Sequence, residues 1–169
     1  MSNLKNQLQA LQIIKKQRVK LTSGLIADFY VDMKAAYASA KMLKLLASKI
    51  ARRIKNNATC IAGTGYGGLP LASAIALEKN LKLVLIREKA RKHGRNTLID
   101  GYVPIKNDNV ILVDDVFTTG SSLKRMAKTL KKTKAKILSA HVVVDRSNRS
   151  NKLRLSFPIS ALIRVEELL

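Results

Sequence analysis

An apolar run that ends in two acids and several small polar residues is the segment of this sequence best suited to chemistry. Val110–Val113 is apolar, Asp114 and Asp115 follow it directly, and Thr118–Ser122 reads Thr-Thr-Gly-Ser-Ser. Backbone N–H groups at the start of a helix, together with nearby hydroxyls, bind phosphate. The two carboxylates would repel that phosphate, but they suit the vicinal hydroxyls of a sugar or the water around a cation. The pattern therefore indicates a site for a ribose 5-phosphate.

A capped helix is the structural alternative for this segment, with Thr118 or Thr119 as the N-cap and Asp115 near the helix dipole. Such a cap explains one threonine. It does not explain two acids at the end of an apolar strand followed by five small polar residues. We therefore favour a binding site.

Two more segments are rich in residues that bind anions. Gly63–Gly68 is glycine-rich, so its backbone N–H groups could approach an anion closely, although a tight strand-to-helix turn would use the same glycines. Arg87–Asn96 holds five cations and one histidine, which excludes a core position but also suits a solvated loop. The cations of the helix after the acid pair, Arg125 among them, are expected to face solvent.

Hydrophobic periodicity predicts the elements that carry these segments. Apolar runs indicate strands, and the segments between them have helical patterns. Strands that are apolar throughout and alternate with helices predict a parallel sheet covered on both faces, an α/β, doubly wound fold whose ligands bind beyond the carboxyl ends of the strands. The predicted strands are 28–32, 59–63, 81–87, 110–114 and 137–144, and the predicted helices are 3–17, 38–56, 70–79 and 121–132.

Length and composition limit the class of protein. The 169 residues predict one domain over 1–169, and 47% hydrophobic residues exclude a disordered chain. The net charge of +21 suits nucleic acid, an acidic membrane surface or phosphorylated metabolites, and it also suits a merely basic surface. The single cysteine, Cys60, excludes an intrachain disulfide and a cysteine-based zinc site. With no apolar run long enough to span a bilayer, we expect a cytoplasmic protein without a membrane partner.

The segment around Asp114 resembles the ribose-phosphate signature of the type I phosphoribosyltransferases. The resemblance implies the fold of that family, with a core over about 36–150 and a small N-terminal hood made of residues 1–35 plus the C-terminal segment. It implies that the acids hold the ribose hydroxyls of phosphoribosyl pyrophosphate (PRPP) and that the hydroxyl-rich loop holds its 5-phosphate. The family more often has Gly where Ser121 stands. The substrate-binding residues implied here are Asp114, Asp115, Val116, Phe117, Thr118, Thr119, Gly120, Ser121 and Ser122.

The glycine-rich stretch resembles the pyrophosphate loop of the same family. The resemblance implies that Gly65, Tyr66, Gly67 and Gly68 bind substrate. Some orotate-using relatives carry Lys where Gly67 stands, so that positive charge is missing here.

The basic stretch resembles the mobile loop of the orotate phosphoribosyltransferases. Arg87, His93 and Gly94 match it in register, whereas Glu88 and Arg91 each stand where Lys is usual. Lys89 restores the first charge one residue along, and Arg91 keeps the second with a different geometry. The resemblance implies that Arg87 and Lys89 bind substrate, and that the catalytic residues are Arg91, His93 and Asp115.

Two further segments resemble the orotate branch of the family. Leu21–Lys34 is similar to its hood motif, which implies that Lys34 binds substrate. Arg146 stands where an arginine pairs with the orotate carboxylate, a role that suits a planar guanidinium. The alternative for Arg146 is an ordinary surface ion pair with Asp145 or another neighbour. Phe29 could stack on a base or simply pack.

The resemblance as a whole implies an orotate phosphoribosyltransferase. Such an enzyme transfers the 5-phosphoribosyl group of PRPP to orotate, giving orotidine 5-phosphate and pyrophosphate in pyrimidine biosynthesis. It implies Mg²⁺ held mainly by substrate oxygens, with no protein metal ligands, and a homodimer whose basic loop reaches the neighbouring site. Two alternatives stay open: a purine or uracil as the base, and a regulator that kept the PRPP site and binds nucleic acid. The positive net charge favours the regulator. The sequence shows no helix-turn-helix or similar nucleic-acid-binding motif, however, so nucleic acid is not the favoured partner.

Overall fold

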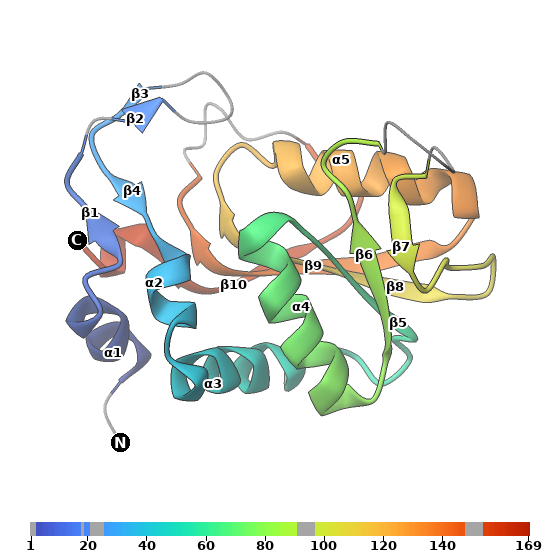
Figure 1. Cartoon of the computed structure of the whole chain (residues 1–169), viewed down its shortest axis with the longest axis horizontal. Helices are drawn as coiled ribbons and strands as arrows, with labels where there is room; N and C mark the ends of the chain where they lie inside the picture. The colour runs from blue at the N-terminus through green and yellow to red at the C-terminus, as the bar shows by residue number, and fades with distance from the viewer. Residues whose placement is uncertain (1–2, 18, 21–25, 91–96, 148–153) are drawn as a thin grey trace.

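A six-stranded sheet forms the centre of the molecule in the computed structural model, which describes residues 3–17, 19–20, 26–90, 97–147 and 154–169 (Figure 1). The strand order is β10-β9-β8-β5-β6-β7, and all neighbours run parallel except β6 and β7. The predicted, mostly parallel sheet is therefore confirmed. Its strands are β5 (Cys60–Thr64), β6 (Lys82–Ile86), β7 (Ile99–Gly101), β8 (Asn109–Phe117), β9 (Lys136–Asp145) and β10 (Ile159–Arg164).

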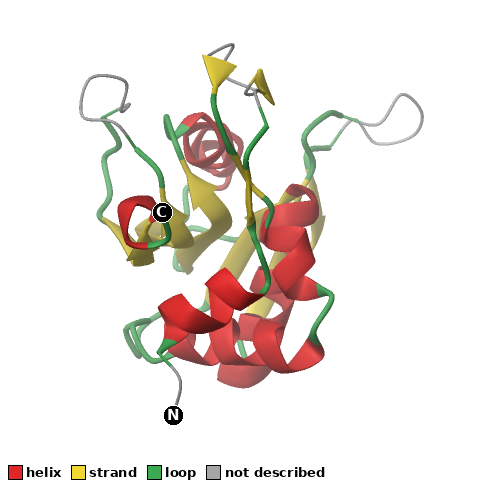
Figure 2. Ribbon diagram, turned by 90° about the vertical axis from the view of Figure 1, so that its left-hand side faces the viewer, coloured by secondary structure: helices red, strands yellow, loops and turns green. Residues whose placement is uncertain are grey.

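Helices cover both faces of this sheet, as expected for a doubly wound fold (Figure 2). Side chains that alternate along one strand explain this arrangement, because successive residues point to opposite faces. Ile111 and Val113 of β8 belong to the buried cluster of α3 and α4, whereas Val110 and Leu112 belong to that of α5. The helices are α2 (Met33–Tyr37), α3 (Ala40–Ala51), α4 (Gly65–Lys79) and α5 (Ser121–Leu130).

The N-terminal segment differs from the predicted helix over 3–17. Helix α1 covers only Leu4–Ala10, and Gln12 then has a positive φ of 49°, which reverses the chain. The following β1 (Ile14–Lys15) pairs antiparallel with β4 (Tyr30–Val31), a ladder that the local pattern did not predict. Two other short strands, β2 (Val19–Lys20) and β3 (Ile26–Ala27), also pair antiparallel.

The C-terminal end lies against this segment. Gln9 Nε2 donates a hydrogen bond of 3.2 Å to the carbonyl oxygen of Leu168, just after the 3-10 helix η3 (Val165–Glu167). This hydrogen bond joins the N-terminal segment to the C-terminal end of the chain. In the part of the chain that the structure describes, no helix is both long and apolar enough to cross a membrane.

Helix α4 begins earlier than predicted. The glycine-rich stretch is not a separate loop, because Gly65 is already the first residue of the helix and Thr64, at the end of β5, is its N-cap. Gly65 has a φ of +62°, a conformation that side chains rarely adopt. The strand β8 also extends beyond its predicted end at residue 114, so that Asp115 lies within the strand together with Asp114.

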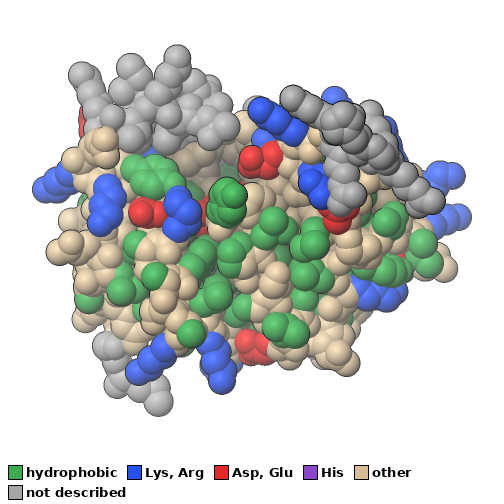
Figure 3. Space-filling view, in the orientation of Figure 1, with side chains coloured by type: hydrophobic (Ala, Val, Ile, Leu, Met, Phe, Trp, Pro, Cys, Tyr) green, Lys and Arg blue, Asp and Glu red, His purple; other side chains and the backbone are tan. Residues whose placement is uncertain are grey.

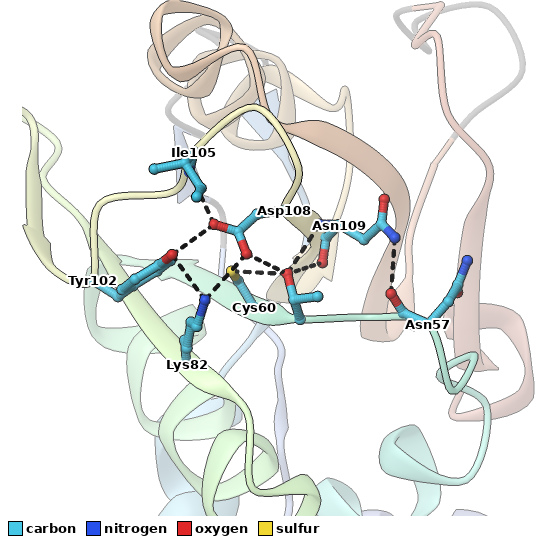
Figure 4. A network of polar contacts seen from close by, with 8 residues as sticks. Asn57, Cys60, Lys82, Tyr102, Ile105, Asp108 and Asn109 are labelled. Carbon is cyan, nitrogen blue, oxygen red and sulfur yellow. Dashed lines mark hydrogen bonds and ion pairs between the residues drawn. The ribbon is translucent and has the colours of Figure 1, made fainter.

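A buried polar network ties together the amino ends of β5, β6 and β8 (Figure 4). Asp108, only 4% exposed, accepts hydrogen bonds of 2.8 Å from both Tyr102 Oη and Thr59 Oγ1. It also accepts from the backbone N–H of Ile105 and forms an ion pair of 3.3 Å with Lys82. Burial alone would raise the pKa of Asp108, but these donors overcome it and hold that pKa well below its usual range.

Candidate active site

The carboxyl ends of β5, β6 and β8 surround a cavity of about 340 Å³. Its walls come from α2, the first turn of α4, the end of β8 and the first turns of α5. This is the sheet edge at which a doubly wound fold is expected to bind its ligand. The predicted site residues that line the cavity are Lys34, Gly65, Tyr66, Gly67, Asp114, Asp115, Val116, Phe117, Thr118, Thr119, Gly120, Ser121, Ser122 and Arg146.

The other predicted site residues lie elsewhere or outside the described part of the chain. Gly68 is buried below the cavity, where an added Cβ would lie 2.9 Å from the carbonyl oxygen of Val113. Arg87 forms an ion pair with Asp100, and Lys89 is exposed. Neither of these two cations lines the cavity in this structure. Arg91 and His93 fall outside the described residues, so their catalytic roles stay predictions.

Asp114 lies between α4 and α5, with Oδ1 3.2 Å from a Cβ built on Gly68. Asp114 is 7% exposed, and its carboxylate accepts hydrogen bonds from the Ser122 hydroxyl of α5 and, at 3.0 Å, from the backbone N–H of Asp115. Burial, and then the charge of Asp115, raise the pKa of Asp114 well above its usual range. Asp114 therefore holds a proton more readily than an exposed carboxyl would. A carboxyl pair of this kind can both accept from and donate to neighbouring hydroxyls.

Asp115 lies directly against the first turn of α4. A Cβ built on Gly67 would lie 2.2 Å from Asp115 Oδ2, a distance that no side chain tolerates. A side chain at this position would therefore force the Asp115 carboxylate to move. The carboxylate fills the space that a lysine at this position would need, which gives a physical reason for the missing charge.

The start of α5 forms the opposite wall. Gly120 is the N-cap residue, with a φ of +88° and no side chain to cap the helix. The proposed alternative, in which Thr118 or Thr119 is the N-cap, is therefore wrong. Thr119 Oγ1 instead lies 2.8 Å from Ser121 Oγ, so two hydroxyls stand together at the positive end of a ten-residue helix. This arrangement suits a phosphate.

Arg146 forms the third side of the cavity. Its guanidinium lies 4.2 Å from the centre of the Phe29 ring, and its backbone N–H donates to the carbonyl oxygen of Phe117 at the end of β8. Asp145 forms its ion pair with Arg164, not with Arg146. The guanidinium of Arg146 is thus held in place by a ring. Burial lowers its pKa, but an arginine remains a cation at neutral pH.

Lys34 lies on the same side of the cavity. Its ammonium contacts Tyr30 Oη at 2.8 Å and Asp32 at 3.3 Å. The hydrogen bond with Tyr30 is the largest cause of the raised pKa of Lys34. The charge of this lysine is therefore stabilised, and its position is defined by two neighbours.

The structure adds residues that the sequence reasoning did not assign. Thr64, Glu88 and Arg125 also line the cavity. The side chain of Arg125 is 38% exposed, as expected in part, but it also lines the cavity and forms an ion pair of 3.4 Å with Glu88. A signal was present in the sequence: Arg125 follows Ser121 by four residues, so the two share one face of α5.

Tyr37 lies behind the acids without lining the cavity. Burial, and then the charges of Asp115 and Asp114, raise the pKa of its phenol, which therefore stays protonated. Its buried Oη has no hydrogen-bond partner among the residues that the structure describes. Over the same residues, no group of three or more His, Cys, Asp or Glu side chains could hold a metal ion.

Comparisons with known proteins agree with this geometry. Residues 32–158 match the model of the phosphoribosyl transferase domain. The chain is 38% identical to an orotate phosphoribosyltransferase of Pyrococcus horikoshii over 160 residues, covering 92% of this chain and 86% of the relative. It is 30% identical to that of Methanocaldococcus jannaschii over 169 residues, covering 99% and 96%.

A solved structure shows the same fold. The orotate phosphoribosyltransferase of Aeropyrum pernix superposes with a TM-score of 0.74 at 22% identity, covering 99% of this chain and 96% of that one. The resemblance drawn from the motifs is thereby confirmed. The chain belongs to the phosphoribosyl transferase family and, within it, to the orotate phosphoribosyltransferases.

Proposed function

We propose that this chain transfers the 5-phosphoribosyl group of PRPP to orotate, giving orotidine 5-phosphate and pyrophosphate for pyrimidine biosynthesis. One observation carries the proposal: the acid pair and the start of α5 face the same cavity. A ribose 5-phosphate presents vicinal hydroxyls, which suit the acids, and a phosphate, which suits the start of a helix. The curated relatives reported above are orotate enzymes, which favours orotate over a purine or uracil.

The acids would hold the sugar. Asp114 and Asp115 each use one oxygen to accept a backbone N–H, at 3.0 and 2.8 Å, which orients both carboxyl groups. Further lone pairs of each group are available to ribose hydroxyls. The 5-phosphate would bind to the backbone and hydroxyls of Thr118–Ser122. With both ends of the ribose phosphate held, the anomeric carbon is placed toward the base.

Arg146 and Lys34 would hold the base. A guanidinium can donate two parallel hydrogen bonds to the orotate carboxylate, and the Phe29 ring under Arg146 restricts its orientation. Lys34 adds a second positive charge to the lining of the same cavity. A cation pair of this kind favours an anionic base such as orotate over a neutral one.

Catalysis would rest on positioning and on charge. Orotate N1 attacks C1 of the ribose as pyrophosphate leaves, and the sugar becomes cation-like in between. The acid pair lies beside that developing positive charge, while the first turn of α4 and the basic loop would neutralise the leaving group. Arg87, Lys89, Arg91 and His93 would act in that loop, which would also exclude water when it closes.

Magnesium fits this site as a metal that arrives with the substrate. Mg²⁺ is commonly held by one or two carboxylates and the substrate's phosphates. Because Asp114 and Asp115 would hold the ribose hydroxyls, the metal would be held mainly by oxygens of the substrate. The metal would neutralise the charge of the diphosphate as it leaves.

We also propose a homodimer. Helix α4 exposes two large apolar side chains, Tyr66 at 87% and Leu77 at 84%. The face that carries α4 in Figure 1 shows apolar side chains gathered over its middle and Lys and Arg mostly toward its margins (Figure 3). A second copy would cover this surface. The buried free thiol of Cys60 suits a reducing compartment, so we place the enzyme in the cytoplasm.

The ultraviolet absorbance of orotate tests the proposed reaction. Orotate mixed with the protein, PRPP and Mg²⁺ is expected to lose its absorbance in a PRPP-dependent manner, and a chelator should stop the loss. Adenine, hypoxanthine and uracil serve as the comparison panel. Turnover of one of these bases without turnover of orotate would contradict the assignment.

A further inference from the structure

The carboxylate of Glu88 occupies the place at the start of α4 where an anion is expected. A Cβ built on Gly65, the first residue of this 15-residue helix, would lie 3.1 Å from Glu88 Oε1. The positive end of a helix dipole attracts negative charge. Glu88 is 62% exposed at the side chain, so it reaches this place from the rim of the cavity.

Arg125 approaches the same place from the other wall. Its Nη2 lies 3.4 Å from Glu88 Oε1, at the outer limit of a hydrogen bond. Its Nε is buried and has no hydrogen-bond partner within the described part of the chain. A guanidinium has five donors, so most of the binding capacity of Arg125 in the cavity is unused.

We propose that Arg125 binds the diphosphate of PRPP, and that Glu88 occupies this diphosphate subsite until the substrate displaces it. The inference rests on the function proposed above and assigns two residues to it. A diphosphate offers several oxygens and more charge than one carboxylate, so it pairs better with both Arg125 and the start of α4. The ion pair that it replaces is long and partly exposed, and such pairs are weak.

This arrangement makes Glu88 an internal competitor. Removal of its charge should strengthen the binding of diphosphates, and removal of Arg125 should weaken it. Ligands without a diphosphate should bind equally in both cases. The pair would thus favour PRPP, which carries a diphosphate, over ribose 5-phosphate, which lacks the diphosphate but is otherwise the same.

The test is titration calorimetry of the full chain with Mg²⁺–pyrophosphate and, separately, with ribose 5-phosphate. We expect E88Q to bind pyrophosphate about three- to tenfold more tightly, the size of one close charge pair in a solvated site. We expect R125Q to bind it about 10- to 100-fold more weakly, as for the loss of charged hydrogen bonds. R125K should recover part of the loss. Ribose 5-phosphate affinity should change less than about twofold in all three, because no charged pair is lost with that ligand.

Two variants control for net charge alone. Glu78 is exposed near the far end of α4, so E78Q makes the same charge change as E88Q away from the cavity. Lys128 is exposed on α5, so K128Q matches R125Q. Both should bind pyrophosphate like the unchanged protein.

Three results would overturn the inference. Weaker pyrophosphate binding by E88Q would make Glu88 a magnesium ligand rather than a competitor. Equal affinities for R125Q and K128Q would leave Arg125 outside the subsite. A parallel loss of ribose 5-phosphate binding in R125Q would indicate a structural role. Failure of the unchanged protein to bind either ligand would instead count against the proposed function.

Discussion

A buried aspartate lies near each end of strand β8, and the pKa values of the two aspartates are shifted in opposite directions. At the amino end, Asp108 is surrounded by donors, including the cation of Lys82, and its pKa is lowered. Within the carboxyl end, Asp114 is buried beside a second carboxylate, and its pKa is raised. Both residues are aspartates, one directly before β8 and one within it, but one environment favours the charged form and the other penalises it. At the amino end, groups of the protein supply the hydrogen-bond and charge partners of the aspartate. At the carboxyl end, we expect a ligand to supply them.

Other buried polar atoms follow the same division. Thr64 Oγ1 and Tyr37 Oη are both buried without a hydrogen-bond partner among the described residues, and both lie near the carboxyl end of the sheet. At the amino end, the Thr59 hydroxyl donates to Asp108 and accepts from the backbone N–H of Asn109. A buried hydroxyl without a hydrogen-bond partner lowers the free energy of unfolding. The position of these two hydroxyls near the cavity indicates that the site is kept for function at a cost in stability.

The largest expected effect is on activity at the carboxyl end. Asp114→Asn should lower kcat/KM by about 10²- to 10³-fold, the size found when a group that stabilises transition-state charge is removed. The amide keeps an oxygen that can accept the Asp115 N–H. Because a buried like charge is removed, the melting temperature should not fall. Steady-state kinetics and thermal unfolding check both statements, and a variant with full activity would remove Asp114 from the site.

The second effect is on stability at the amino end. Asp108→Asn should lower the free energy of unfolding by about 2–4 kcal/mol, because Lys82 and three other donors lose a charged acceptor. The folded fraction should keep its kcat/KM. Urea denaturation followed by circular dichroism measures the loss. A large loss of activity with unchanged stability would reverse the comparison between the two ends.

The smallest effect is on the pH dependence of stability, and it has opposite signs at the two ends. The pKa of Asp108 is lowered by folding, so its contribution is present above about pH 4, the unfolded value, and is lost as the pH falls. The pKa of Asp114 is raised, so the folded state loses stability as the pH rises from about 4 toward neutral.

Unfolding free energies of the unchanged protein and the two Asn variants, measured across pH, separate these contributions. The advantage of the unchanged protein over Asp108→Asn should shrink by about 1–2 kcal/mol on acidification. Between about pH 4 and 7, the unfolding free energy of Asp114→Asn should rise by a similar amount relative to that of the unchanged protein. Parallel curves for both variants would show that the two aspartates share one environment.

Much of the fold and of the cavity was predictable because the signals were local. The apolar run before Asp114 and the hydroxyls up to Ser122 lie within one stretch, and a parallel sheet brings strand ends of this kind to one edge. The position of Arg146 at the end of β9 follows from the same rule. The family assignment rested on these stretches and is confirmed.

The errors arose where distant residues decide the local structure. The N-terminal helix stops near Gln12 because Ile14 pairs with Val31, 17 residues away, and this pairing outweighs a helical repeat of leucines. Helix α4 starts at Gly65 because its first turn packs directly against Asp115.

The sequence by itself determined which groups reach the carboxyl edge of the sheet, because apolar runs and short motifs are local properties of the chain. Only the tertiary structure decided how these groups are charged and paired. Arg125 turns into the cavity toward Glu88, 37 residues away in the chain. Asp108 and Asp114 acquire opposite pKa shifts from neighbours that other strands and helices supply. Burial and electrostatic interactions depend on distances in space, and folding alone sets those distances.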